Sequence, residues 1–183
     1  MFENQPVFFV DDEPHIRQAN VQTLELAGVR VQGFGCAEDV LRQLGREWPG
    51  VVVSDIRMPG MDGMQLLARA QEIDRDLPVI LITGHGDVAM AVEAMRQGAY
   101  DFIEKPFAAE RLNDTVKRAL GRRCLTLENR SLRVELEIQS APGPRIVGNT
   151  PAMRRLRATI AQIADTDADV LILGETGTGK ELV

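Results

Sequence analysis

Five side chains in this sequence could together carry out phosphoryl chemistry, because each one follows or ends a short apolar run. They are Asp11, Asp12, Asp55, Thr83 and Lys105. A carboxylate can attack phosphorus as a nucleophile, while a hydroxyl and an ammonium group can contact the phosphoryl oxygens. The residue types therefore predict an aspartate that accepts a phosphoryl group.

Three neighbouring carboxylates repel one another unless a cation neutralises them. Few hard oxygen ligands, with positions left open, suit Mg²⁺, which tends to keep several of its waters. Such a metal could also hold phosphoryl oxygens and offset charge in the transition state. Taken alone, each acid could be a helix cap and Lys105 a surface charge. Only three of the 21 basic residues are lysines, however, and all five residues fall at expected strand ends, which favours a shared site.

The elements that must position these residues alternate between apolar runs and helical patterns. We expect strands at 7–10, 29–34, 51–53, 78–82 and 100–103, and helices at 14–27, 37–44, 64–73 and 88–97, with a long helix from about 108. This alternation predicts an α/β fold, a five-stranded, doubly wound parallel sheet covered by helices on both faces. Ligands of such sheets bind beyond the carboxyl ends of the strands, where the five residues should meet.

Four stretches carry a resemblance to a known family. They are Asp11-Asp12-Glu13-Pro14, Asp55-Ile-Arg-Met-Pro-Gly-Met-Asp-Gly63, Thr83-Gly-His-Gly-Asp87 and Gly98-Ala-Tyr-Asp-Phe-Ile-Glu-Lys-Pro-Phe107. Together they resemble the receiver domains of two-component response regulators, which have a flavodoxin-like (CheY-like) sheet. The resemblance extends from about residue 5 to residue 120, so we expect a receiver domain at 1–120.

The resemblance implies roles for individual residues. Asp55 would be phosphorylated by a sensor histidine kinase, and Thr83 and Lys105 would contact the phosphoryl oxygens. Asp12, Asp55 and the backbone carbonyl of Arg57 would bind Mg²⁺, with Asp11 assisting.

It also makes Phe102 the aromatic switch residue, although phenylalanine lacks the hydroxyl that many relatives have there and could equally be a core residue. Tyr100, two residues earlier, should face the same side of its strand, and Lys105–Pro106 should be a cis bond. His15 and His85 have no carboxylate partner suggested by the sequence, so we expect a solvated residue and a loop residue rather than phosphoryl relays.

The long helical pattern continues past the expected receiver. Apolar or small residues recur at alternating spacings of four and three at Leu120, Cys124, Leu127, Ser131, Val134 and Ile138. This heptad seam, with arginine and glutamate around it, favours a dimeric coiled coil over a helix that packs on its own domain. We expect residues 121–144 to be a signalling helix and linker, ended by Ala141-Pro-Gly-Pro144.

A glycine-rich loop closes the sequence. After an expected helix at 151–164, capped by Thr150, and an expected strand at 170–173 come Gly174, Glu175, Thr176, Gly177, Thr178, Gly179, Lys180 and Glu181. Such a loop before a helix can cradle phosphates with backbone N–H groups and a lysine. Glu181 departs from the usual Ser or Thr, yet the stretch resembles the ATPase loop of sigma-54-dependent activators of the NtrC and DctD group. We expect ATP binding by the intact parent and an incomplete P-loop ATPase segment at 145–183.

The composition of the chain argues against several classes of protein. The net charge of −6 argues against a nucleic-acid coat, no apolar stretch is long enough for a membrane span, and Cys36 and Cys124 fit a reducing cytoplasm. Motifs that complete ATP hydrolysis or bind DNA are missing. We therefore expect no enzyme activity beyond self-phosphorylation and dephosphorylation, and a piece of a longer regulator whose last forty residues have too little core to fold.

The function expected from these observations is a phosphorylation switch. It would dimerise through the receiver and the linker helix and control an attached sigma-54-dependent ATPase. The full-length parent would have sigma-54 RNA polymerase and enhancer DNA as partners. A haloacid-dehalogenase type phosphatase is a second class, but its nucleophile and acid lie two residues apart on the first strand, whereas Asp11 and Asp12 are adjacent. A free-standing receiver is a third class, which the long helix and the ATPase loop disfavour.

Overall fold

The computed structural model describes residues 5–84, 88–140, 148, 150–164, 170–177 and 180. Its contacts divide the chain into two compact units, Met1–Arg133 and Val134–Val183. The predictions made for His85, Thr178, Gly179, Glu181 and the linker at 141–144 lie outside the described residues.

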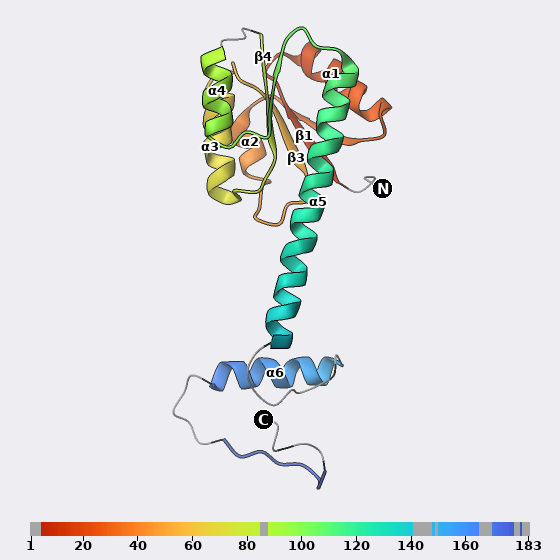
Figure 1. The fold of residues 1–183 in the computed structure, drawn as a ribbon, viewed down its shortest axis with the longest axis vertical. Helices are drawn as coiled ribbons and strands as arrows, with labels where there is room; N and C mark the ends of the chain where they lie inside the picture. Colours follow the sequence, from red (N-terminus) through yellow and green to blue (C-terminus); the bar gives the residue numbers. More distant parts are fainter. Residues whose placement is uncertain are drawn as a thin grey trace. The chain divides into compact units, whose positions relative to one another are not determined.

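The first unit is a five-stranded parallel sheet between two layers of helices, as predicted. The strands are β1 (Pro6–Val10), β2 (Arg30–Phe34), β3 (Val51–Asp55), β4 (Val79–Thr83) and β5 (Asp101–Glu104), in the order β2-β1-β3-β4-β5. The helices are α1 (Pro14–Leu26), α2 (Ala37–Leu41), α3 (Gly63–Ile73), α4 (Val88–Arg96) and α5 (Ala109–Ser140). Figure 1 shows α2, α3 and α4 on one face of the sheet and α1 and α5 on the other.

Each face of the sheet has its own apolar core, and the strands supply both. In β1, Val7 and Phe9 pack towards α1 and α5, while Phe8 and Val10 pack towards α2, α3 and α4. All five residues of β3 and of β4 are buried. Strands covered on both faces need apolar side chains at nearly every position, which explains the continuous apolar runs of the sequence.

The start of α3 packs directly on the end of β3. The Asp62 side chain accepts a hydrogen bond from the Gln65 N–H, and the Gln65 side chain accepts one from the Asp62 N–H, which forms a capping box. A Cβ on Gly63 would collide with the carbonyl oxygen of Asp55. Only glycine therefore lets α3 begin this close to Asp55.

Two local expectations were wrong. Helix α2 ends at Leu41 rather than at Leu44, because the chain turns there through bonds from the N–H groups of Gln43 and Leu44 to the carbonyl of Val40. Tyr100 packs on the core beneath α1 and α5, whereas Phe102 packs on the opposite core. Since Tyr100 lies before the first residue of β5, the alternation of side chains along a strand does not apply to it.

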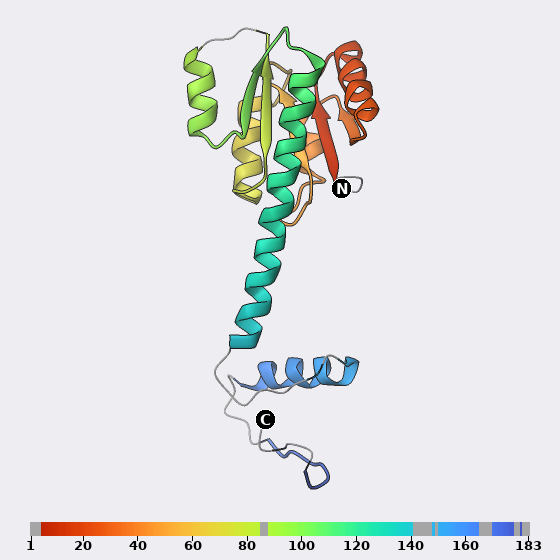
Figure 2. The same cartoon turned by 45° about the vertical axis from the view of Figure 1, so that its right-hand side comes forward.

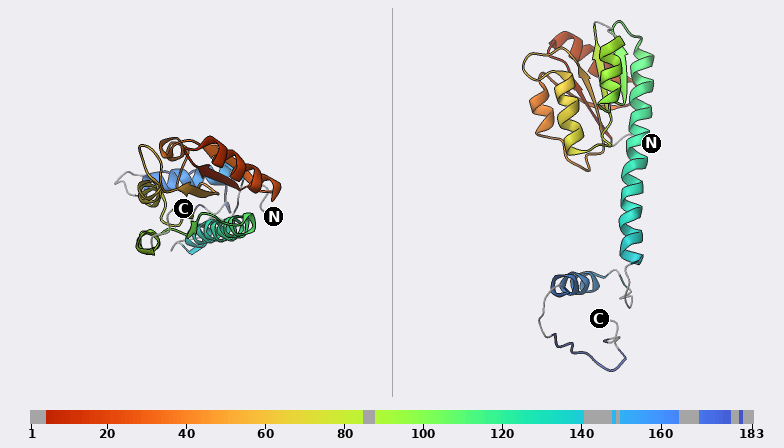
Figure 3. Two further views of the ribbon diagram at one scale, coloured as in Figure 1. Left: turned by 90° about the horizontal axis from the view of Figure 1, so that it is seen from above. Right: turned by 60° about the vertical axis from the view of Figure 1, so that its left-hand side comes forward.

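Helix α5 is the predicted long helix, and its first half belongs to the receiver core. Leu112, Val116, Ala119 and Leu120 are fully buried against the sheet. The expected coiled-coil seam is thus already covered at its first position, Leu120. Figures 2 and 3 show α5 continuing past the end of the sheet.

The second unit contains α6 (Pro151–Ile163), which begins as predicted with Thr150 accepting a hydrogen bond from the Met153 N–H at 3.3 Å. No residue of α6 is buried. The strand expected at 170–173 is not formed, and its four side chains are exposed. Within the described residues no neighbouring strand stands beside it, so its backbone has no ladder to join. Among the described helices none is long and apolar enough to cross a membrane.

Candidate functional site

Three of the predicted site residues meet at the carboxyl edge of the sheet. The Lys105 ammonium nitrogen lies 2.6 Å from Asp55 Oδ1 and 3.3 Å from Asp11 Oδ2. Asp55 ends β3, Asp11 follows β1 and Lys105 follows β5, so three strands of one sheet deliver them. The side chains of both aspartates are buried, and that of Lys105 is 24% exposed. The convergence expected from strand ends is therefore present.

Asp55 is fixed by its neighbours as well as by Lys105. Its Oδ2 accepts a hydrogen bond from the Arg57 N–H at 2.8 Å. The Ser54 hydroxyl donates to the Asp55 carbonyl at 2.8 Å. With one carboxylate oxygen on a backbone donor and the other on an ammonium, the side chain is held in one orientation.

Burial and charge act in opposite directions on Asp11 and Lys105. Burial raises the pKa of Asp11, against the opposing effects of the Glu13 N–H and of Lys105. For Lys105, burial alone would lower the pKa, but the hydrogen bond and charge of Asp55, helped by Asp11, outweigh it and raise the pKa. The lysine consequently stays charged, and a paired cation is available at Asp55.

The remaining predicted residues lie around this cluster. Thr83 ends β4, is buried, and its carbonyl accepts the Lys105 N–H at 2.6 Å. The Asp12 side chain is partly buried and makes no hydrogen bond or ion pair within the described residues. Phe102 is half-buried on the α4 side. The Lys105–Pro106 peptide bond is cis, as the resemblance implied.

Arg17 is a residue of this edge that the sequence reasoning missed. From α1 its guanidinium donates to the backbone carbonyls of Asp11, at 2.5 Å, and Asp12, at 3.4 Å. Its side chain runs over Gly33, where a Cβ would come within 3.3 Å of Arg17 Cγ. The signal in the sequence was Gly33 of β2, which leaves room for the Arg17 side chain. Arg17 in turn holds the backbone of the Asp11–Asp12 loop.

The donor chemistry fits a small hard cation better than a soft one. The edge offers carboxylate oxygens and backbone carbonyls, which suit Mg²⁺ that keeps part of its water. Among the described residues no three His, Cys, Asp or Glu side chains are grouped as ligands.

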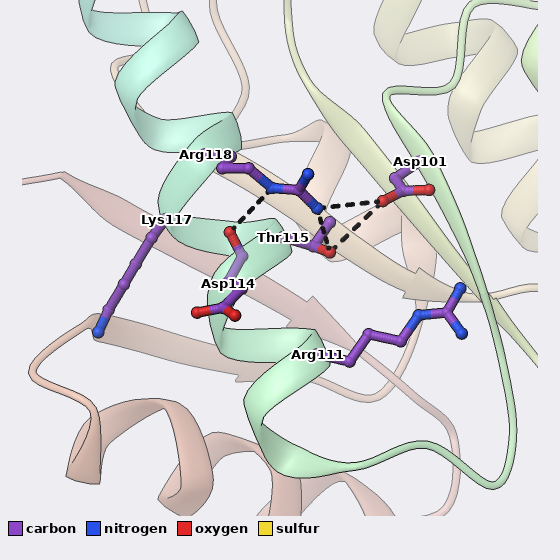
Figure 4. Close-up of a pocket in the computed structure, with 6 residues that line it drawn as sticks. All are labelled: Asp101, Arg111, Asp114, Thr115, Lys117 and Arg118. Atoms are coloured by element: carbon purple, nitrogen blue, oxygen red, sulfur yellow. Dashed lines mark hydrogen bonds and ion pairs between the residues drawn. The ribbon is translucent and has the colours of Figure 1, made fainter.

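A surface pocket lies elsewhere in the receiver, on α5 beside β5. Figure 4 shows its six lining residues, Asp101, Arg111, Asp114, Thr115, Lys117 and Arg118. Arg118 Nη2 donates to the Thr115 hydroxyl at 3.2 Å and lies 3.9 Å from Asp101 Oδ2. These contacts join Asp101, Thr115 and Arg118 to one another, and the pocket does not include any residue of the acidic cluster.

The glycine-rich loop is described only in part. The Lys180 ammonium donates to the backbone carbonyls of Gly174 at 2.9 Å and Glu175 at 2.5 Å. Gly177 has a φ of +84°, a conformation that favours glycine. The described residues thus show the lysine folded back on its own loop.

Two segments of the sequence match known protein families. Residues 7–117 match the response regulator receiver domain, and residues 146–183 match the sigma-54 interaction domain. The chain is 55% identical over 177 residues to the C4-dicarboxylate transport transcriptional regulatory protein DctD of Pseudomonas aeruginosa. That alignment covers 97% of this chain and 38% of the relative, so the chain spans well under half of that protein.

Solved structures agree with the sequence comparison. The solution structure of the beryllofluoride-activated NtrC4 receiver domain dimer has a TM-score of 0.60 at 36% identity, over 64% of this chain and 98% of that one. The crystal structure of NtrX from Brucella abortus in complex with ATP has a TM-score of 0.57 at 35% identity, over 97% of this chain and 38% of that one. The chain belongs to the response regulator receiver family, and it joins its receiver to the start of a sigma-54 interaction domain as regulators of the NtrC and DctD type do.

Proposed function

We propose that this chain is a phosphorylation switch in which Asp55 accepts a phosphoryl group from a sensor histidine kinase. The observation that carries the proposal is the 2.6 Å contact between the Lys105 ammonium and Asp55 Oδ1. A carboxylate that is buried, held by a backbone N–H and paired with a lysine has its nucleophilic oxygens fixed in position.

In the proposed reaction an Asp55 oxygen forms the new bond to phosphorus while the bond from phosphorus to the donor breaks. The Lys105 ammonium exchanges its contact with the Asp55 carboxylate for one with a phosphoryl oxygen. The Thr83 hydroxyl donates a hydrogen bond to a second phosphoryl oxygen. Asp11, 3.3 Å from the same ammonium, keeps a countercharge beside it throughout. Phe102 would respond to movement of Thr83 on the neighbouring strand.

Asp12, Asp55 and the backbone carbonyl of Arg57 would hold Mg²⁺, with Asp11 assisting. When bound, this ion would neutralise the charge that develops on the phosphoryl oxygens. Arg17 keeps the Asp11–Asp12 backbone in place through its two carbonyl contacts.

For the parent protein we propose a cytoplasmic ATPase that acts on sigma-54 RNA polymerase and binds enhancer DNA. The match of residues 146–183 to the sigma-54 interaction domain supports this, as does a glycine-rich loop with its lysine at 180. The residues proposed to bind ATP are 174–181, and the receiver and linker helix would pair two copies. A related receiver is a dimer in its activated form, which supports pairing.

The test is intact mass after incubation with acetyl phosphate and Mg²⁺. We expect one phosphoryl group on the wild-type chain and none on Asp55→Asn. Asp114→Asn, which changes an exposed acid of the α5 pocket, is the matched control and should be modified like wild type. A folded wild-type chain that takes up no phosphoryl group, or Asp55→Asn that takes it up equally, would refute the proposal.

A further inference from the structure

Arg17 binds three consecutive backbone carbonyls in the loop that joins β1 to α1. Its own N–H donates to the carbonyl of Glu13, the N-cap residue, at 2.9 Å, which is the first hydrogen bond of α1. Its guanidinium Nη1 donates to the carbonyls of Asp11 at 2.5 Å and Asp12 at 3.4 Å. One residue therefore fixes the peptide planes of the whole loop.

The two acids of this loop differ in how their side chains are held. Asp11 Oδ1 accepts the Glu13 N–H at 2.9 Å, and Asp11 Oδ2 lies 3.3 Å from the Lys105 ammonium. The Asp12 side chain makes no hydrogen bond or ion pair within the described residues. The position of the Asp12 carboxylate thus depends on its backbone, and Arg17 is the residue that holds this backbone.

Strand β2 and the residue after it leave room for the Arg17 side chain. A Cβ on Gly33 would lie 3.3 Å from Arg17 Cγ and from Val21 Cγ2, and a Cβ on Gly35 would lie 3.5 Å from Arg17 Nη1. Neither glycine has a positive φ, so the backbone does not require glycine at these positions. What the two glycines share is the arginine that lies over them.

The charge of Arg17 is not used to neutralise an acid. Among the described residues its guanidinium contacts carbonyl oxygens and no carboxylate, although Asp11, Asp12 and Glu13 are its neighbours in the loop. The carboxylates of the loop consequently stay available to a cation. On a bound divalent ion Arg17 has two opposite effects, because its charge repels the ion while its hold on the loop orients a ligand.

We propose that Arg17 is a positioning residue for the metal ion of the acidic edge, where it places the Asp12 carboxylate for Mg²⁺. The inference rests on the proposed function for the identity of the metal and of its ligands. It adds that Arg17 sets the affinity for the ion and leaves the contact between Lys105 and Asp55 unchanged.

A Mn²⁺ titration of the full chain, followed by the EPR signal of the free ion, measures this affinity without a phosphoryl donor. Mn²⁺ prefers the same oxygen ligands as Mg²⁺. We expect Arg17→Met to raise the Kd for Mn²⁺ about tenfold, since contacts that orient metal ligands have effects of this size. Arg30→Met removes the same charge from the exposed start of β2 and should bind like wild type. Urea midpoints of all variants verify that they are folded.

The direction of the change separates positioning from charge. If Arg17 acted through its charge alone, its removal would relieve repulsion and tighten the binding of a cation. A Kd that Arg17→Met lowers or leaves unchanged would therefore overturn the proposal, as would a wild-type chain that binds no Mn²⁺.

Gly33→Val tests the same contact while every charge is kept. The larger side chain must displace Arg17, so we expect the Kd to rise about threefold, in the direction of Arg17→Met. In the double variant the second change should add little, because both act through one contact. A Kd unchanged by Gly33→Val, or losses that add in the double variant, would count against the proposal.

Phosphoryl uptake, followed by intact mass on the same proteins, separates this role from the proposed function. At saturating Mg²⁺ we expect Arg17→Met to react within about twofold of the wild-type rate, since Lys105 and Asp55 are unchanged. Its half-maximal rate should require about tenfold more Mg²⁺. A wild-type chain that binds Mn²⁺ with this dependence on Arg17 but takes up no phosphoryl group would refute the proposed function alone. Phosphoryl uptake together with a Kd that Arg17→Met does not raise would refute only the role given to Arg17.

Discussion

At the scale of single residues, Lys105 links the chemistry of the acidic edge to its electrostatics. It contacts both buried acids and its pKa is raised by them, so it remains a cation beside the proposed nucleophile. Its replacement would leave Asp11 and Asp55 facing each other without a countercharge.

We expect Lys105→Gln to slow phosphoryl uptake from acetyl phosphate by roughly one to two orders of magnitude, because a preorganised charge that contacts the transferred group is lost. Intact mass followed over time measures the rate. Lys117→Gln, on the exposed side of α5, is the control and should react like wild type. Equal rates for the two variants would contradict the role given to Lys105.

Gly63 has a steric role in the same site. A Cβ there would collide with the Asp55 carbonyl oxygen, which belongs to rigid backbone. We expect Gly63→Ala to lower the free energy of unfolding by about 1–3 kcal/mol and to slow phosphorylation, because β3 or α3 must shift. Urea unfolding measures the first effect, and Gly45→Ala, which meets no atom within 4 Å, should change little.

At the scale of elements, a cluster of charges that we call the base clamp (Asp74, Asp76, Arg123 and Arg130) makes the stability of the α5 packing depend on pH. Arg123 is fully buried, and both arginines, which belong to α5, pair with Asp74. Burial alone would raise the pKa of Asp74, but Arg130, the Asp76 N–H and Arg123 lower it from 3.8 to about 2. A carboxyl whose pKa is lowered by folding stabilises the folded state at any pH above its pKa in the unfolded chain. This contribution is lost as the pH falls from about 4 towards 2. The shift corresponds to about 2 kcal/mol.

We expect Asp74→Asn to destabilise the chain by about 3–5 kcal/mol at neutral pH, because Arg123 is left buried without a countercharge. The free energy of unfolding of the variant should also no longer show the decrease that Asp74 causes between about pH 4 and 2. Unfolding in urea at a series of pH values measures both. Asp76→Asn, whose side chain is 55% exposed, should cost under about 1 kcal/mol. Equal costs for the two would mean that burial of the clamp is unimportant.

The strands and helices of the receiver could be predicted because short apolar runs alternate with helical patterns along this part of the sequence. The three central strands β1, β3 and β4 are mainly apolar runs, and Asp11, Asp55 and Lys105 follow or end three strands of the sheet. The base clamp could not be predicted in this way, because Arg123 and Arg130 look like ordinary charges on a polar helix. Only the three-dimensional position of Asp74 turns them into partners. The strand expected at 170–173 failed for the opposite reason, since its local pattern needs a neighbour that the described residues do not supply.

At the scale of the molecule, the receiver unit extends further along α5 than the sequence match does. The match ends at 117, whereas the compact unit includes residues up to Arg133. We expect a chain that ends at residue 133 to have a free energy of unfolding within about 1 kcal/mol of that of the full chain. The core and the contacts of Arg123 and Arg130 with Asp74 are complete in it. One ended at 117 should lose several kcal/mol, because Leu120 and both clamp arginines are removed. Equal urea midpoints for the two shortened chains would disprove this boundary.

The unbroken course of α5 from Ala109 to Ser140 has a mechanical consequence. A helix advances about 1.5 Å and rotates about 100° per residue. One residue inserted after Arg130 would leave the receiver intact yet swing everything downstream by more than a quarter turn, whereas seven inserted residues would nearly restore the phase. If the proposed switch acts through this helix, its output should depend periodically on the length of α5.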